Sequence, residues 1–133
     1  MSKETIREEM RSAVDKDGQL SCESAHRIAE RVGTEPLDVG KEANDAGIRI
    51  TKCQLGLFGY APSKGMPGYK LVHELDTLPE PLSKAINGAA VQGKVSCLAL
   101  WRIAQQHGVS RPEMGNIVET LKTKVAPCQL GCF

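Results

Sequence analysis

The chain has 133 residues, of which 41% are hydrophobic and 25% are charged, and its formal net charge is +1. This composition belongs to a folded globular protein and excludes a disordered polyelectrolyte. Because no run approaches the roughly 18 apolar residues of a membrane span, and because the opening MSKETIREEMRS is too polar for a secretion signal, we expect a cytoplasmic protein without a membrane partner.

The first predicted element is a helix over residues 6–16, in which Ile6 and Met10 recur at helical spacing among charged residues. Gly18 ends this helix, and after two extended residues Ser21 is placed to cap a second helix. The second helix has one apolar face, which consists of Cys22, Ala25, Ile28, Ala29 and Val32.

A third helix follows a tight turn at Gly33. Thr34 is its predicted cap, and Val39, Ala43 and Ala46 form its apolar stripe. A short strand over residues 48–50 then leads into a distinctive closing string, Cys53-Gln54-Leu55-Gly56-Leu57-Phe58.

The same pattern returns 75 residues further along, so the chain is an internal repeat. Residues 18–58 align with residues 93–133 without a gap, and 13 of the 41 pairs are identical. Chance would give about one identity in twenty pairs, so the duplication is real. The chain therefore divides into a first repeat at 1–58, a Gly/Pro-rich linker at 59–80 and a second repeat at 81–133.

The second repeat is predicted to contain the same elements. Its first helix spans residues 82–91, and its second helix is capped by Ser96. The third helix begins at Ser110, whose spacing to Glu113 is that of a capping box, and the strand Lys124-Val125 follows it. The inner face of the second helix consists of Cys97, Leu100, Ile103, Ala104 and His107, and that of the third consists of Met114, Ile117 or Val118, and Leu121.

This order of elements resembles the winged-helix branch of the helix-turn-helix family. Ala29 stands four residues before Gly33, and Ala104 stands four residues before Gly108, as in the family's closely crossing helix pair. The resemblance implies a mostly α protein with two tandem winged-helix-like modules and short strands. The wing is where the chain departs from the family, because a single strand leads into Gln-Leu-Gly and no basic hairpin follows.

The resemblance also implies a DNA-binding protein that regulates transcription, with the third helix in the major groove. Residues 6–58 carry eight basic and ten acidic side chains, a net charge of −2, whereas residues 81–133 carry six and two, a net charge of +4. The third helix of the second repeat has side chains of the types that read bases or neutralise phosphates. We therefore predict contact with duplex DNA chiefly through the second repeat, at Arg111, Asn116, Thr120, Lys122 and Lys124.

Two other functions stay open. Helix-turn-helix modules also serve as dimerisation and docking units, and a chain of nearly neutral charge suits a protein partner or a homo-oligomer. A thiol- or metal-responsive switch is the third interpretation, because the chain has five cysteines. Their odd number in a reducing compartment argues against a disulfide framework.

The cysteines fall into two groups. Cys22 and Cys97 lie on inner helical faces, where a cysteine acts as a small buried hydrophobe. Cys53 and Cys128 begin the closing string in both repeats, and the second string adds Cys132. Packing explains this string, but Cys53, Cys128 and Cys132 are also weak candidate ligands for zinc or an iron–sulfur cluster. No Cys-x2-Cys pair accompanies them.

Catalytic motifs are missing from the sequence. It contains neither a phosphate-binding G-x-x-x-x-G-K-[ST] loop nor a dinucleotide fingerprint. His73 stands near Glu74 and Asp76, which is too little for a catalytic constellation. We therefore do not expect an enzyme, and we expect no cofactor beyond the metal alternative.

Overall fold

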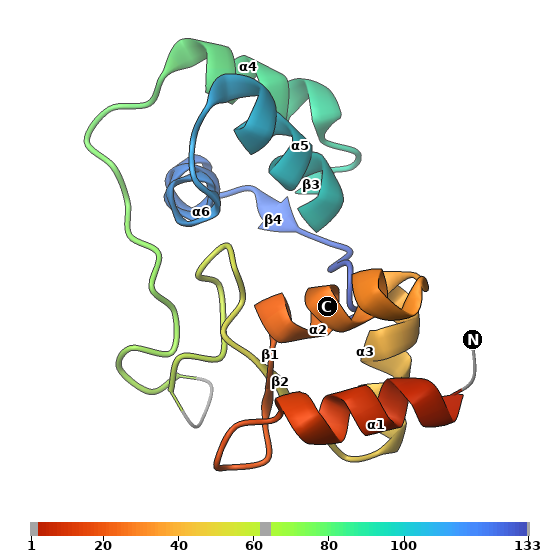
Figure 1. Cartoon of the computed structure of the whole chain (residues 1–133). Coiled ribbons are helices and arrows are strands. Elements are labelled where there is room, and N and C mark those ends of the chain that lie inside the picture. The colour runs from red at the N-terminus through yellow and green to blue at the C-terminus, as the bar shows by residue number, and fades with distance from the viewer. Residues whose placement is uncertain (1–2, 62–64, 133) are drawn as a thin grey trace.

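The computed structural model describes residues 3–61 and 65–132. The predicted linker residues 62–64 and the last residue of the second closing string, Phe133, lie outside the described residues. About half of the chain is helical, in six described helices accompanied by short strands, which confirms the mostly α class (Figure 1).

The first repeat forms three helices and two short strands. They are α1 (Lys3–Ala13), β1 (Leu20–Ser21), α2 (Cys22–Val32), α3 (Pro36–Asp45) and β2 (Ile50–Thr51). Helix α1 begins and ends three residues earlier than predicted. The Asp15 carboxylate accepts hydrogen bonds from the backbone N–H groups of Asp17 and Gln19 at 2.9 and 3.0 Å. Such a local turn competes with continued helix, which explains the early end of α1.

Both ends of α2 follow the prediction. The Ser21 hydroxyl accepts a hydrogen bond from Ser24 N at 3.1 Å, and Gly33 adopts the left-handed conformation with φ 81°. A β-carbon would make that conformation costly, so glycine is the natural residue at this helix end. All five predicted inner-face residues of α2 are buried.

The predicted start of α3 is wrong. Glu35 is the N-cap and makes no side-chain cap hydrogen bond, while the Thr34 hydroxyl donates to the Asp38 carboxylate at 2.7 Å. Pro36 begins the helix, where its missing N–H costs nothing. Val39 and Ala43 are buried as predicted, but Ala46 caps the far end and is exposed.

The second repeat forms the same elements in the same order. They are α4 (Glu80–Ala89), β3 (Lys94–Val95), α5 (Cys97–His107), α6 (Arg111–Leu121) and β4 (Lys124–Val125). The predicted caps Ser96 and Ser110 accept hydrogen bonds from Ala99 N and Glu113 N at 3.1 and 3.2 Å. His107 was predicted on the inner face of α5, but it lies in the last turn and is exposed.

The short strands pair in parallel within each repeat. Leu20 lies opposite Ile50 in β1 and β2, and Lys94 lies opposite Lys124 in β3 and β4. Each pair joins the residues before the second helix to those after the third. In the described part of the chain, no hairpin follows the third helix of either repeat, so the wing of the winged-helix family has no counterpart there.

The two repeats exchange their closing strings, so each hydrophobic core contains residues from the other repeat. One core is built on α1, α2 and α3 but also contains Cys128 and Leu130. The other is built on α4, α5 and α6 but also contains Cys53 and Leu55. In Figure 1 the blue C-terminal segment runs down beside α2 and α3, while the yellow segment after β2 rises towards α6. Each repeat is therefore completed by the closing string of the other.

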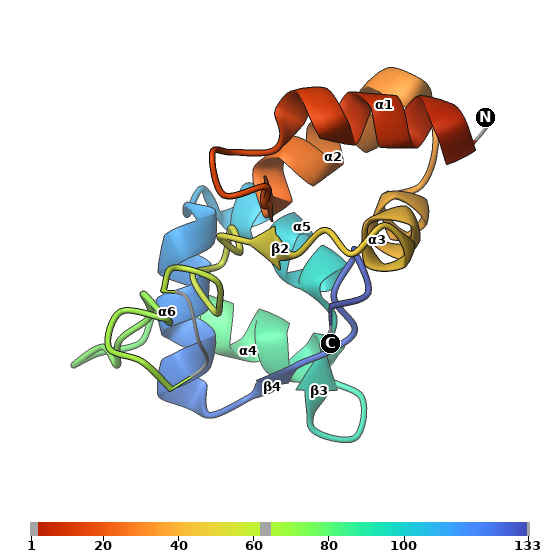
Figure 2. The same ribbon diagram turned by 90° about the horizontal axis from the view of Figure 1, so that it is seen from below.

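Helices α2 and α5 face each other between the repeats, and Figure 2 shows them side by side from below. Among the described residues, no helix is long and apolar enough to cross a membrane.

Candidate functional site

The interface between the repeats is where chemically useful side chains gather, and the exchanged closing strings build it. A β-carbon added to Gly40 would lie 1.8 Å from the Leu130 carbonyl oxygen, and one added to Gly115 would lie 1.8 Å from that of Leu55. Both distances are far inside van der Waals contact. A glycine at this position in both repeats thus lets the closing string of the other repeat pass over the third helix in direct backbone contact.

Equivalent residues meet across this interface. Position 26 aligns with position 101, and the His26 and Trp101 rings stack with centroids 4.5 Å apart and planes tilted by 45°. The contacts of Gly40 and Gly115 are reciprocal in the same way. When two residues are in contact and their aligned counterparts in the other repeat are also in contact, the repeats are related by a local twofold axis.

Two of the residues predicted to contact DNA hold the linker. Asn116 Oδ1 accepts a hydrogen bond from His73 N at 3.0 Å, and Thr120 Oγ1 accepts one from Leu75 N at 2.8 Å. Residues 71–75 therefore lie along α6 and cover the part of its surface that carries Asn116 and Thr120.

The basic residues of the same prediction are placed differently. Lys122 pairs with Glu74 of the linker, and Arg111 lies 3.5 Å above the Trp101 ring while donating a hydrogen bond to Gln54. Lys124 is exposed on β4. Four of the five predicted residues therefore already have partners within the chain.

Four of the cysteines are buried, and three of these four resist ionisation. Burial raises the pKa of Cys22 to about 12 and that of Cys97 to about 11, and it also raises the pKa of Cys53. Gln54 Nε2 lies 3.9 Å from the Cys22 sulfur, and the equivalent Gln129 Nε2 lies 3.5 Å from the Cys97 sulfur. At neutral pH these three thiols keep their protons, and the thiolate is the nucleophilic form of cysteine.

Cys128 differs because it has a second thiol beside it. A side-chain interaction with Cys132 lowers the pKa of Cys128, and the Leu130 N–H adds a contact of 3.4 Å to its sulfur. The same interaction raises the pKa of Cys132, since its proton is shared with the Cys128 thiolate. Cys128 is buried, whereas Cys132 is exposed.

The first repeat cannot form this pair, since Leu57 stands at the position that aligns with Cys132. The three predicted metal ligands, Cys53, Cys128 and Cys132, do not lie together as a set that could bind one ion. In residues 3–61 and 65–132, no three His, Cys, Asp or Glu side chains lie close enough together to hold a metal ion.

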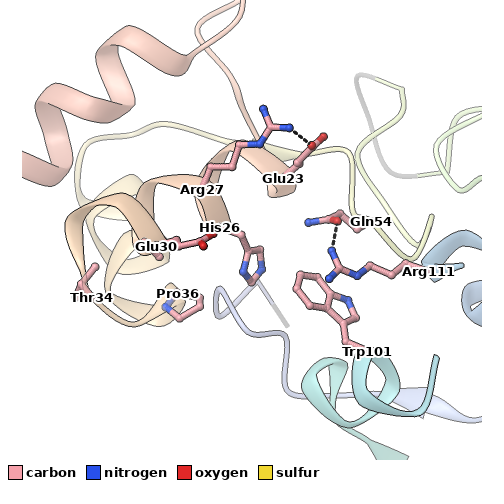
Figure 3. A pocket seen from close by; sticks show the side chains of 10 residues that line it. Glu23, His26, Arg27, Glu30, Thr34, Pro36, Gln54, Trp101 and Arg111 are labelled. Carbon is pink, nitrogen blue, oxygen red and sulfur yellow. Dashed lines mark hydrogen bonds and ion pairs between the residues drawn. The ribbon is translucent and has the colours of Figure 1, made fainter. Parts of the chain in front are cut away.

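A pocket of about 480 Å³ opens beside the stacked rings at the centre of the interface (Figure 3). Its walls come from both repeats: α2 supplies His26 and Glu30, and the second repeat supplies Trp101 and Arg111. Burial, followed by the charge of Arg111, lowers the pKa of His26 to about 4, so its imidazole is neutral at physiological pH.

Sequence reasoning missed this pocket because the ring positions are not retained between the repeats. The alignment still held a signal, since it paired His26 with Trp101 and both lie at mid-helix on the same side. Residues at equivalent positions meet when two copies pack around a twofold axis.

Comparison with known proteins gives no match for this chain, whether with family models, with curated proteins or with solved structures.

Proposed function

We propose that the protein is a thiol-based redox switch in which hydrogen peroxide joins Cys128 and Cys132 as a disulfide. The pairing of these two side chains in one turn carries the proposal, because it places two sulfur atoms that can be joined next to each other. The pair lies in the string that completes the core of the other repeat. A chemical change there acts on the contact between the repeats.

The reaction needs two steps. The Cys128 thiolate attacks one peroxide oxygen, which forms an S–O bond, breaks the O–O bond and releases hydroxide that is protonated to water. The Cys132 sulfur then attacks the sulfur of the sulfenic acid, which forms the S–S bond and breaks the S–O bond, and the leaving hydroxide takes up the Cys132 thiol proton as a second water. Two thiols are oxidised while one peroxide is reduced to two waters. A small oxidant suits the site, because only 7% of Cys128 is exposed.

The disulfide acts on the packing of the string. In the reduced form the Cys128 sulfur accepts a hydrogen bond from the Leu130 N–H, and Leu130 is 3% exposed in the core of the first repeat. A bond to Cys132 draws that sulfur towards the exposed side of the turn. The closing string then packs less well against α1, α2 and α3, and the contact between the two repeats weakens.

The test uses the full chain, titrated with hydrogen peroxide and examined by mass spectrometry. We expect one intramolecular disulfide between Cys128 and Cys132, reversed by a thiol reductant, with Cys22, Cys53 and Cys97 still free. The alkylation rate of Cys128 should rise with an inflection below the ordinary thiol pKa, because Cys132 lowers the pKa of Cys128. An inflection near pH 9, or no disulfide in excess peroxide, contradicts the proposal.

Two variants separate the pair from its surroundings. Cys132→Ser should halt oxidation at the Cys128 sulfenic acid, which a dimedone adduct reveals. Leu57→Cys gives the first repeat the same pair, so Cys53 should gain a disulfide that it lacks in the parent chain. If Cys53 is oxidised equally well without that partner, the neighbouring thiol is not the cause of reactivity.

Binding of duplex DNA is the second candidate, favoured by the +4 charge of residues 81–133. Lys94 and Lys124 lie opposite each other in β3 and β4, and both are exposed. Because the linker covers Asn116 and Thr120, we infer contact through this basic strand pair instead of the α6 surface.

Titration with random duplex DNA at two salt concentrations tests this candidate. A phosphate-binding surface weakens steeply with salt. Lys94→Ala should weaken binding and reduce the salt slope by about one unit, whereas Asn116→Ala should change little. Binding that fails at both salt concentrations leaves a protein partner as the alternative for this surface.

A further inference from the structure

The pocket between the repeats has the dimensions and position of a small-molecule site. Its volume of about 480 Å³ falls within the range of roughly 300–1,000 Å³ typical of such sites. Both repeats contribute walls, and Figure 3 shows His26 of α2 facing Trp101 of α5 with Arg111 above the indole.

Two buried nitrogen atoms at this pocket lack partners. His26 Nε2 and Trp101 Nε1 have no hydrogen-bond partner in the part of the chain that the structure describes. Leaving a buried polar group unpaired costs about 1–3 kcal/mol. The indole N–H is only a donor, so the missing partner at Trp101 is an acceptor.

The charges around the pocket define the acceptor further. Arg111 lies 3.5 Å above the Trp101 ring and uses one of its five N–H donors on Gln54. Arg27 is already paired with Glu23, and Glu30 adds a second carboxylate to the wall. The two arginines and two glutamates leave the wall with no net formal charge, so Arg111 is the only counter-charge for an anion that the Arg27–Glu23 pair does not already occupy. The two wall carboxylates would repel a dianion more strongly than a monoanion.

We propose that this pocket binds a small monocarboxylate, whose oxygens accept hydrogen bonds from the Trp101 indole N–H and the Arg111 guanidinium. The neutral His26 imidazole supplies a further N–H when Nε2 carries its proton. Planar guanidinium donors match a carboxylate with two parallel hydrogen bonds. This inference is independent of the redox switch, because none of the cysteines lines the pocket.

Trp101 is the only tryptophan in the chain, so its fluorescence reports on the pocket directly. The full-length protein is titrated with benzoate, with benzamide as an uncharged probe of the same shape, and with inorganic phosphate as the dianion. We expect a saturable change with benzoate, none with benzamide, and little with phosphate. Bound benzoate should also raise the pKa of His26 from about 4 in an NMR titration, since a nearby anion favours imidazolium.

Variants test the contacts. Arg111→Ala should weaken benzoate binding at least tenfold, and Arg111→Lys should recover only part of it because the planar donors are lost. Arg102→Ala is the matched control, since Arg102 is exposed on α5 but does not line the pocket. Circular dichroism verifies that each variant is folded.

Three results overturn the proposal: benzamide binding as well as benzoate, phosphate binding better, or no saturable signal with benzoate in the folded parent chain.

Discussion

At the residue scale, single atoms decide how closely the repeats approach. Gly115 lies in α6 under the Leu55 carbonyl, and Val72 of the linker lies 2.9 Å from the place where its β-carbon would be. Gly88 also lies inside a helix, α4, but nothing lies within 4 Å of its added β-carbon. Close packing therefore requires a glycine at position 115, whereas no neighbouring atom requires one at position 88.

This contrast yields the first prediction. Gly115→Ala forces backbone apart and should lower the free energy of unfolding by about 3 kcal/mol or more, as overpacking does. Gly88→Ala should raise it by about 0.5–1 kcal/mol, because alanine favours the helix. Urea denaturation of both variants measures the difference. Equal effects would mean that the Leu55 string does not cross α6 closely.

The second prediction concerns His26. Burial, helped by Arg111, lowers its folded pKa from 6.5 to about 4, so between these values the unfolded chain binds a proton that the folded chain excludes. Its contribution is fully present above pH 6.5 and is lost as the pH falls to 4. The loss should be on the order of 2–3 kcal/mol, less than the full shift implies, because solvent screens the partly exposed ring.

Unfolding free energies measured between pH 7 and pH 4 test this for the parent chain and for His26→Phe. The variant should lose less stability over this range, and the exposed His107→Gln serves as the matched control. An identical pH slope in His26→Phe and the parent would show that His26 is protonated as easily in the folded chain.

At the element scale, the repeats share a frame but begin their third helices differently. Ser110 caps α6 through Glu113 N, whereas its aligned partner Glu35 begins α3 without a side-chain cap. Pro36 partly offsets the difference, since it needs no partner for an N–H. In each repeat the two strands pair in parallel, so the residues before the second helix are hydrogen-bonded to those after the third helix.

The third prediction follows from these caps. Ser110→Ala leaves an amide without its partner and should cost about 1 kcal/mol of unfolding free energy. Glu35→Ala at the aligned position should cost much less, because no cap hydrogen bond is lost there. Thermal denaturation compares the two. A larger loss from Glu35→Ala would contradict this account of the two helix starts.

At the scale of the whole molecule, the exchange of closing strings makes the two repeats one folding unit. Leu55 is fully buried in the core of α4, α5 and α6, and Leu130 is buried in that of α1, α2 and α3. Domains of about 50–60 residues are marginal because they bury little of their surface. Losing a buried leucine and a buried cysteine from such a small core removes more free energy of folding than the net stability of the isolated repeat.

The fourth prediction is that neither half folds alone. Peptides of residues 1–58 and 81–133 should each lack cooperative unfolding, and mixing them should restore helical circular dichroism with a concentration-dependent midpoint. Leu130→Ala in the intact chain should lower stability by about 2–5 kcal/mol for the same reason. A half that folds as a stable monomer would contradict the exchange.

Local sequence determined the helices, the serine caps and the repeat itself. Ser21, Ser96 and Ser110 cap their helices as predicted, because a capping hydrogen bond spans only three residues. Where two local partners compete, local reasoning fails: Thr34 bonds Asp38 in place of capping α3. The inner faces followed from helical periodicity, apart from the helix ends at Ala46 and His107.

Only the tertiary structure decided the site. The pairing of His26 with Trp101, the seat of Leu130 beside Gly40 and the cover of Asn116 by the linker all join residues far apart in sequence. Periodicity indicates which face of a helix is buried, but not which segment covers it, because that choice depends on the relative placement of whole elements. The charge of α6 thus followed from its composition, whereas its availability to DNA depended on where residues 71–75 lie.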